Sequence, residues 1–146
     1  MDQKMFCYQC QETAGCKGCT VVGVCGKQQD VAAMQDLLVW VTKGICAVTT
    51  RLREEGRAVA DEVNHLVTEN LFTTITNANF DKAAIEKRIE KTLEMKTALW
   101  EQLERRDNLP EEAGWTGEPS EFIKKASEAG VLIGQNEDII SLRSLI

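Results

Sequence analysis

Apolar side chains in the central part of the chain recur at alternating steps of three and four residues, the spacing of an amphipathic helix. The longest run has no interruption and predicts one helix with the seam Val31, Met34, Leu38, Val41, Ile45, Val48 and Leu52. Asp30 is suited to cap the start of this helix, and Gly56 suits its C-terminal end. Such a seam is typical of helix bundles and coiled coils.

Two further helices are predicted after this one. The second covers about residues 57–75, with Ala60, Val63, Val67, Leu71 and Ile75 facing inward. The third begins after Asp81 as N-cap, ends before residue 108, and carries Ile85, Ile89, Leu93, Trp100 and Leu103. Phe80 is placed to pack against Ile85 as a hydrophobic staple.

The remainder is predicted to hold shorter elements. Residues 111–118 are expected to form a loop and residues 120–129 a short helix with Phe122, Ile123 and Ala126 on one face. Residues 131–133 are expected to be extended or buried. Asn136 should cap a last helix that carries Ile139, Leu142, Leu145 and Ile146. Because that helix ends on an apolar residue without a cap, we expect the chain to be part of a longer protein.

These patterns predict an all-α fold, a three-helix bundle with an N-terminal cysteine-rich cluster-binding loop. The expected division is residues 1–29 for that loop, 30–107 for the bundle, and 108–146 for a loop, a short helix and the start of a second helical group. The aromatic content of only 5% also favours helices with aliphatic seams over a β-sandwich.

The net charge and the distribution of apolar residues exclude several classes of function. With 17 Lys and Arg against 23 Asp and Glu, the net charge is −6, which argues against nucleic acid as a partner. We see no run of 18 apolar residues and no basic region followed by an apolar one, so neither a membrane span nor a secretory signal is predicted. We therefore expect a cytoplasmic protein, without membrane contact, whose cysteines stay reduced.

Five of the six cysteines fall within the first 25 residues, among several glycines. Cys7, Cys10, Cys19 and Cys25 follow the pattern C-x2-C-x8-C-x5-C. Thiolates are soft donors, and four of them on one short loop suit an iron–sulfur cluster or zinc. The glycines let the backbone wrap closely around such a group.

Two other interpretations of the cysteines stay open from spacing alone. Cys7 with Cys10 and Cys16 with Cys19 form two C-x2-C pairs that could bind zinc, although their separation is short and Cys25 would be left over. A disulfide cluster is disfavoured because no export signal is visible. In the cluster interpretation Cys16 is a spare thiol.

The other conspicuous residues favour structural roles. Cys46 is predicted to be a small packed residue on the long helix, and His65 to be solvated on the polar face of the second helix. The tryptophans are expected to pack. No nucleophile–base pair, phosphate-binding loop or H-E-x-x-H motif is present, so we expect no catalytic residue in this chain.

The cysteine loop also resembles a known family. The segments Met5 to Thr13, Gly18 to Val21 and Gly23 to Lys27 are similar to the N-terminus of the hybrid cluster protein (prismane, hydroxylamine reductase) family. Leu71 to Asn79, Trp115 to Gly117, and Asn136 to Asp138 resemble that family in the same order. The resemblance therefore covers nearly the whole chain.

This resemblance implies that Cys7, Cys10, Cys19 and Cys25 are the ligands of a 4Fe-4S cubane, because the wider cysteine spacing belongs to members with a 2Fe-2S cluster. It also implies a second, hybrid Fe–S–O cluster, where hydroxylamine or nitric oxide is reduced, with ligands beyond the end of this chain. One histidine and two cysteines outside the motif could not supply that site.

The expected role is thus an electron-transfer domain of an oxidoreductase. An electron-donor redox protein and the remainder of the full-length parent are the expected partners. The alternative is a zinc-stabilised helical interaction module, in which the metal only locks the loop to the bundle.

Overall fold

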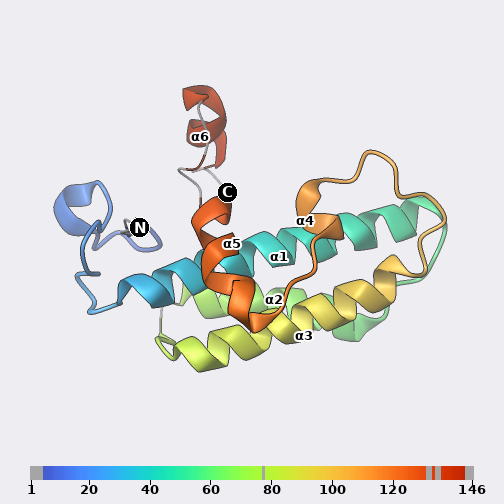
Figure 1. Ribbon diagram of the computed structural model, residues 1–146, viewed down its shortest axis with the longest axis horizontal. Coiled ribbons are helices and arrows are strands. Elements are labelled where there is room, and N and C mark those ends of the chain that lie inside the picture. The colour runs from blue at the N-terminus through green and yellow to red at the C-terminus, as the bar shows by residue number, and fades with distance from the viewer. Residues whose placement is uncertain (1–4, 77, 131–132, 134–135, 144–146) are drawn as a thin grey trace.

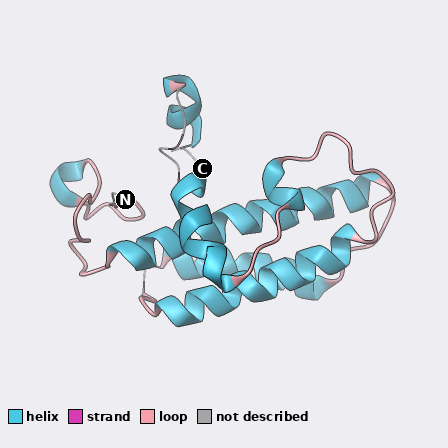
Figure 2. Cartoon of the chain, in the orientation of Figure 1, coloured by secondary structure: helices cyan, strands magenta, loops and turns pink. Residues whose placement is uncertain are grey.

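The computed structural model describes residues 5–76, 78–130, 133 and 136–143, and these form helices and loops (Figure 2). The helices are α1 (Gln29–Glu54), α2 (Asp61–Ile75), α3 (Lys82–Trp100), α4 (Glu111–Gly114), α5 (Phe122–Ala129) and α6 (Glu137–Arg143). Two 3-10 turns, η1 (Ala14–Cys16) and η2 (Pro119–Glu121), precede α1 and α5. The described ranges contain no β-strand, so the all-α prediction is confirmed.

Helix α1 is the central element, and α2, α3, α4 and α5 all pack against it (Figure 1). Every predicted seam position of α1 is buried, from Val31 to Leu52. The predicted cap was wrong, however: the helix begins at Gln29, and Gln28 is the N-cap. The backbone turns helical two residues earlier than expected, and the Asp30 carboxylate accepts a hydrogen bond from Val31 N–H within the first turn.

The end of α1 is as predicted. Gly56 has φ +76°, a left-handed conformation that favours glycine. Arg57 N–H donates to the carbonyl of Leu52 at 2.9 Å and Gly56 N–H to that of Arg53 at 3.0 Å. These two bonds form a Schellman motif, which satisfies carbonyls left open at the helix end.

Most of the buried apolar residues form two clusters that share α1. The first surrounds its N-terminal half and comprises Val31, Ala33, Met34, Leu37, Leu38, Val41, Ile85, Ile89, Leu93, Phe122 and Ala126. The second surrounds its C-terminal half and comprises Ile45, Val48, Leu52, Val63, Leu66, Leu99, Leu103 and Ala113.

The length and composition of α1 would also allow it to cross a membrane, since its most apolar window has a mean hydropathy of 1.4. That window is 67% buried inside the structure. The burial identifies α1 as the core helix of the bundle, and it is the one such candidate among the described residues.

The predicted inward face of α2 was wrong at three of its five positions, whereas Val63 and the partly buried Val67 do pack inward. Val63 is buried, but Ala60 is exposed, Leu71 is 38% exposed and Ile75 is 69% exposed. The buried positions are Val63, Leu66, Asn70 and Thr74. The apolar pattern missed this face because two of its members are polar.

Helix α3 begins as predicted, because the Asp81 carboxylate accepts hydrogen bonds from the N–H groups of Ala83 and Ala84. Ile85, Ile89 and Leu93 are buried, and Phe80 packs against the first cluster. The helix ends at Trp100, earlier than predicted, and Leu103 is buried in the turn that follows.

The segment expected to be a loop contains the single turn α4. Buried Lys96 secures this segment by donating from Nζ to the carbonyl of Glu112 at 2.7 Å and to that of Trp115 at 2.5 Å. Trp115 also packs edge-on against Trp40 with 5.5 Å between ring centroids.

The last two helices agree with the sequence patterns in part. Phe122 and Ala126 of α5 are buried, whereas Ile123 is exposed. Asn136 caps α6 as predicted, since its Oδ1 accepts from the N–H groups of Asp138 and Ile139. Residues 131–133 were expected to be extended or buried, and of these Ile133 is 43% exposed and so is not buried. Val131, Leu132, Leu145 and Ile146 lie outside the described residues.

Candidate metal centre

The cysteine-rich loop precedes α1 and lies at its N-terminal end (Figure 1). Cys7 and Cys19 face each other across it in an antiparallel bridge. Cys7 N–H donates to the Cys19 carbonyl at 3.0 Å, and Cys19 N–H donates to the Cys7 carbonyl at 2.8 Å. Both cysteines are buried in a small cluster with Met5 and Ala32 of α1. Two of the four predicted ligands are therefore fixed side by side through their backbones.

The other cysteines of the loop are less enclosed. Cys10 is half-buried, and Cys16 and Cys25 are exposed. Within the part of the chain that the structure describes, no three His, Cys, Asp or Glu side chains are grouped to hold a metal ion. The structure thus pairs Cys7 with Cys19 and does not gather the four thiols, and the ligand set stays a prediction.

Two glycines of this loop lie where there is little room for a side chain. Gly18 has φ +115°, and a Cβ there would lie 2.6 Å from Cε2 of Phe6. A Cβ at Gly23 would lie 3.0 Å from Sγ of Cys25 and equally close to Cβ of Lys27. A side chain at Gly23 would therefore fit only if Cys25 or Lys27 moved slightly.

A buried lysine, Lys27, contacts one of the paired cysteines. Lys27 is fully buried, and its Nζ donates to Cys7 Sγ at 3.5 Å and to Gln35 Oε1 at 2.6 Å. The same Nζ lies 5.7 Å from the ring centroid of Phe80, the residue next to the N-cap of α3. A cationic group is therefore held against one predicted ligand sulfur.

Sequence reasoning missed both Lys27 and its partner. Gln35 is buried on α1 and donates in turn from Nε2 to the carbonyl of Asn79 at 3.4 Å. The available signal was a polar residue four positions after Val31, on the inward side of an otherwise apolar seam. Such a residue needs a polar partner in the interior.

Two further titratable groups lie near the loop. Burial raises the pKa of the Asp36 carboxyl to about 7, and the positive charge of Lys27 opposes that rise. Burial also raises the pKa of Tyr8, with smaller contributions from the negative charges of Asp36 and Cys7. The surroundings of Cys7 are thus partly desolvated, and Lys27 is the cation in direct contact with its sulfur.

The chemistry of these residues fits a thiolate-bound metal group. Cys7, Cys10, Cys19 and Cys25 supply four soft donors from one loop, and their deprotonated forms carry negative charge. The buried Lys27 ammonium is positioned to compensate part of that charge.

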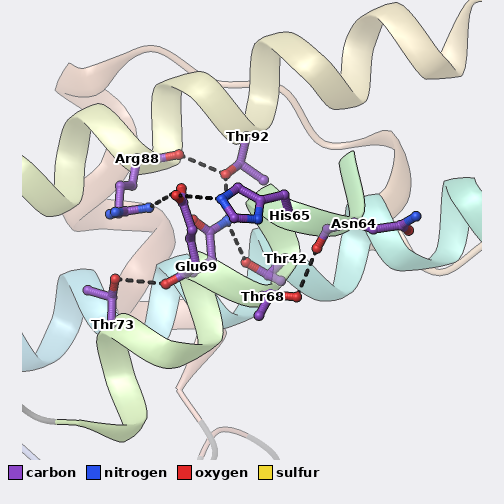
Figure 3. Close-up of polar contacts among 9 residues, drawn as sticks. Thr42, Asn64, His65, Thr68, Glu69, Thr73, Arg88 and Thr92 are labelled. Atoms are coloured by element: carbon purple, nitrogen blue, oxygen red, sulfur yellow. Dashed lines mark hydrogen bonds and ion pairs between the residues drawn. The ribbon is translucent and has the colours of Figure 1, made fainter. Parts of the chain in front are cut away.

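Cys46 and His65 lie outside the loop, on α1 and α2, and His65 is solvated as predicted. His65 is exposed on α2 and pairs through Nε2 with Glu69 at 3.2 Å, which in turn pairs with Arg88 at 3.3 Å (Figure 3). Cys46 is half-buried on α1, and burial raises the pKa of its thiol.

Comparison with known proteins shows similarity over the whole chain. The sequence model of the Prismane/CO dehydrogenase family matches residues 5–146. A hydroxylamine reductase of Clostridium perfringens is 53% identical, with 97% of this chain and 27% of that protein aligned. A hydroxylamine reductase of Desulfovibrio desulfuricans is 49% identical, with 100% and 27% aligned. This chain thus spans about a quarter of the length of these relatives.

Proposed function

Because this chain belongs to the Prismane/CO dehydrogenase family, we propose that Cys7, Cys10, Cys19 and Cys25 bind an iron–sulfur cluster of the 4Fe-4S type. Proteins of this family bind iron–sulfur clusters. The observation that carries the proposal is that the family match begins at Met5 and so takes in a four-cysteine loop with two members already paired. Such a cluster supplies one-electron transfer.

We further propose that the chain is the electron-transfer part of a hydroxylamine reductase. The relatives named above carry that name, and about three quarters of their length lies outside the match. Reduction of hydroxylamine to ammonia, or of nitric oxide, and the hybrid Fe–S–O cluster that performs it belong to that remaining length in this proposal. The residues of this chain then have no catalytic role.

In this proposal the loop holds the cluster and the bundle holds the loop. Cys7 and Cys19 are fixed by their mutual hydrogen bonds and by packing on Ala32 of α1. An electron-donor redox protein of the cytoplasm approaches near the loop, where Val21 and Val24 are 83% and 65% exposed. The remainder of the parent protein accepts the electron.

The test is anaerobic purification of this chain followed by iron and sulfide analysis. We expect a brown protein that bleaches with dithionite and contains about four irons per chain. Cys19→Ala should abolish the cluster, because it removes a buried ligand. Cys16→Ala is the matched control in the same loop and should retain the full iron content, because Cys16 is exposed and lies outside the proposed ligand set.

Two results would contradict the proposal. A colourless protein loaded with zinc would identify the loop as a structural zinc site and the chain as a helical interaction module. Equal loss of iron in both cysteine variants would show that the ligand assignment is wrong.

A further inference from the structure

Lys27 is the most unusual buried group near the loop. A buried ammonium is costly unless anionic or hydrogen-bonding partners satisfy it. Its two described hydrogen bonds go to the neutral amide oxygen of Gln35 and to Sγ of Cys7. The buried Asp36 carboxyl also interacts with the charge of Lys27, but of the two hydrogen-bond partners only the sulfur can become an anion, as a thiolate.

We propose that Lys27 is a positioning residue for the iron–sulfur cluster, whose ammonium holds the Cys7 thiolate and favours the reduced state of the cluster. This inference rests on the proposed function above, because it requires a cluster bound through Cys7. It assigns to Lys27 a role in setting the reduction potential rather than in binding iron.

The direction in which Lys27 shifts the reduction potential follows from its charge. An oxidised 4Fe-4S core of charge +2 with four thiolates carries −2, and reduction by one electron makes it −3, with no bond formed or broken. A positive charge beside one ligand sulfur stabilises the more negative state more strongly, especially where water is excluded. The Lys27 ammonium therefore raises the potential.

The bundle, rather than the loop, sets the position of this charge. Gln35 Oε1 holds Nζ from α1 at 2.6 Å, and the Phe80 ring lies 5.7 Å away at the start of α3. Gln35 is itself tied to the carbonyl of Asn79. The ammonium is thus anchored by Gln35 of α1 and, through Gln35, by the segment that precedes α3.

The experiment compares midpoint potentials of the whole chain, purified anaerobically, with iron content measured on each sample. Lys27→Met removes the charge and keeps the length of the side chain. At the wild-type midpoint we expect at least a tenfold lower ratio of reduced to oxidised cluster, which is 59 mV toward lower potential for one electron. Lys27→Arg keeps the charge and should stay within threefold of the wild type.

Lys96→Met is the matched control. Lys96 is equally buried and its substitution removes the same net charge, but its Nζ binds carbonyls of the 111–118 segment rather than a cysteine. We expect the wild-type potential in this variant. An equal shift in Lys96→Met, or an unshifted Lys27→Met, would overturn the inference.

The outcomes separate this inference from the proposed function. A wild-type chain without iron and sulfide would remove both, whereas an iron-loaded wild type with an unshifted Lys27→Met would remove only the inference. If Lys27→Met fails to retain iron, the iron content of Lys27→Arg decides. Recovered iron in Lys27→Arg supports a requirement for the positive charge at Cys7. A Lys27→Arg chain that also lacks iron contradicts that requirement.

Discussion

Gly44 lies in the interior of α1, where the backbone of α4 passes close by. A Cβ at this position would come within 2.1 Å of the carbonyl oxygen of Glu112. That oxygen cannot easily retreat, because it accepts the hydrogen bond from buried Lys96. Glycine is therefore required here by space, although it is unfavourable within a helix.

We expect Gly44→Ala to destabilise the chain by about 1–3 kcal/mol, because the clash outweighs the roughly 1 kcal/mol that alanine gains in a helix. The measurement is urea unfolding followed by circular dichroism. Gly114→Ala is the control, since a Cβ there would meet only the Trp100 ring at 3.6 Å, an ordinary contact. A neutral Gly44→Ala would mean that α4 moves away freely.

Some residues of the candidate site could be predicted from the sequence and others could not. The four predicted ligands came from cysteine spacing and from family resemblance. Lys27 could not be predicted, because its role depends on a contact with Cys7 twenty positions away and on Gln35 of α1. A lysine in a loop is normally solvent-exposed, and only the fold encloses this one.

At the scale of the element, α1 and α2 differ in how well sequence predicts their buried faces. The α1 seam is apolar at every step, so its helical spacing predicts a single buried face. In α2 two sets of residues at helical spacing compete for the buried face. The sequence favoured Val63, Val67, Leu71 and Ile75. The buried set is Val63, Leu66, Asn70 and Thr74. The polar members Asn70 and Thr74 concealed it, because their burial depends on hydrogen bonds that no periodicity reveals.

Two leucines of α2 test this assignment with the same chemical change. Leu66→Ala should destabilise the chain by about 2–5 kcal/mol, because Leu66 is buried in the second apolar cluster. Leu71→Ala should cost less than about 1 kcal/mol, because Leu71 is 38% exposed. Both variants gain the same helix propensity, so the difference between their unfolding midpoints reports burial alone. The reverse order would restore the face predicted from sequence.

At the scale of the whole molecule, the two apolar clusters are joined by a layer of polar side chains across α1, α2 and α3. Asn70 Nδ2 donates to Thr42 Oγ1 at 3.2 Å and to Thr92 Oγ1 at 2.8 Å. Figure 3 shows Thr42, Glu69 and Thr92 on three different helices. Each threonine hydroxyl donates at 2.7 Å to a carbonyl of its own helix, that of Leu38 or Arg88.

These bonds fix how the layer is satisfied. Because both hydroxyl protons are engaged, the threonines can only accept from Asn70, and the amide nitrogen must face them. Asn70 Oδ1 is left buried without a hydrogen-bond partner in the described structure. An unpaired buried oxygen costs stability, whereas replacing a polar group by an apolar one of similar shape can be neutral or stabilising.

Asn70→Leu, which keeps the number and branching of side-chain heavy atoms, should therefore change the free energy of unfolding by less than about 1 kcal/mol or raise it. Thr42→Val should lower it by about 1–3 kcal/mol, because it leaves a buried amide N–H of Asn70 without its acceptor. Urea unfolding of both variants, at one pH, makes the comparison. A loss in Asn70→Leu larger than that in Thr42→Val would show that Oδ1 has a partner, such as a buried water, and that the layer is fully paired. If Asn70→Leu instead loses less free energy of unfolding than Thr42→Val, the polar layer aligns three helices at the expense of stability, as a single buried asparagine does in a coiled coil.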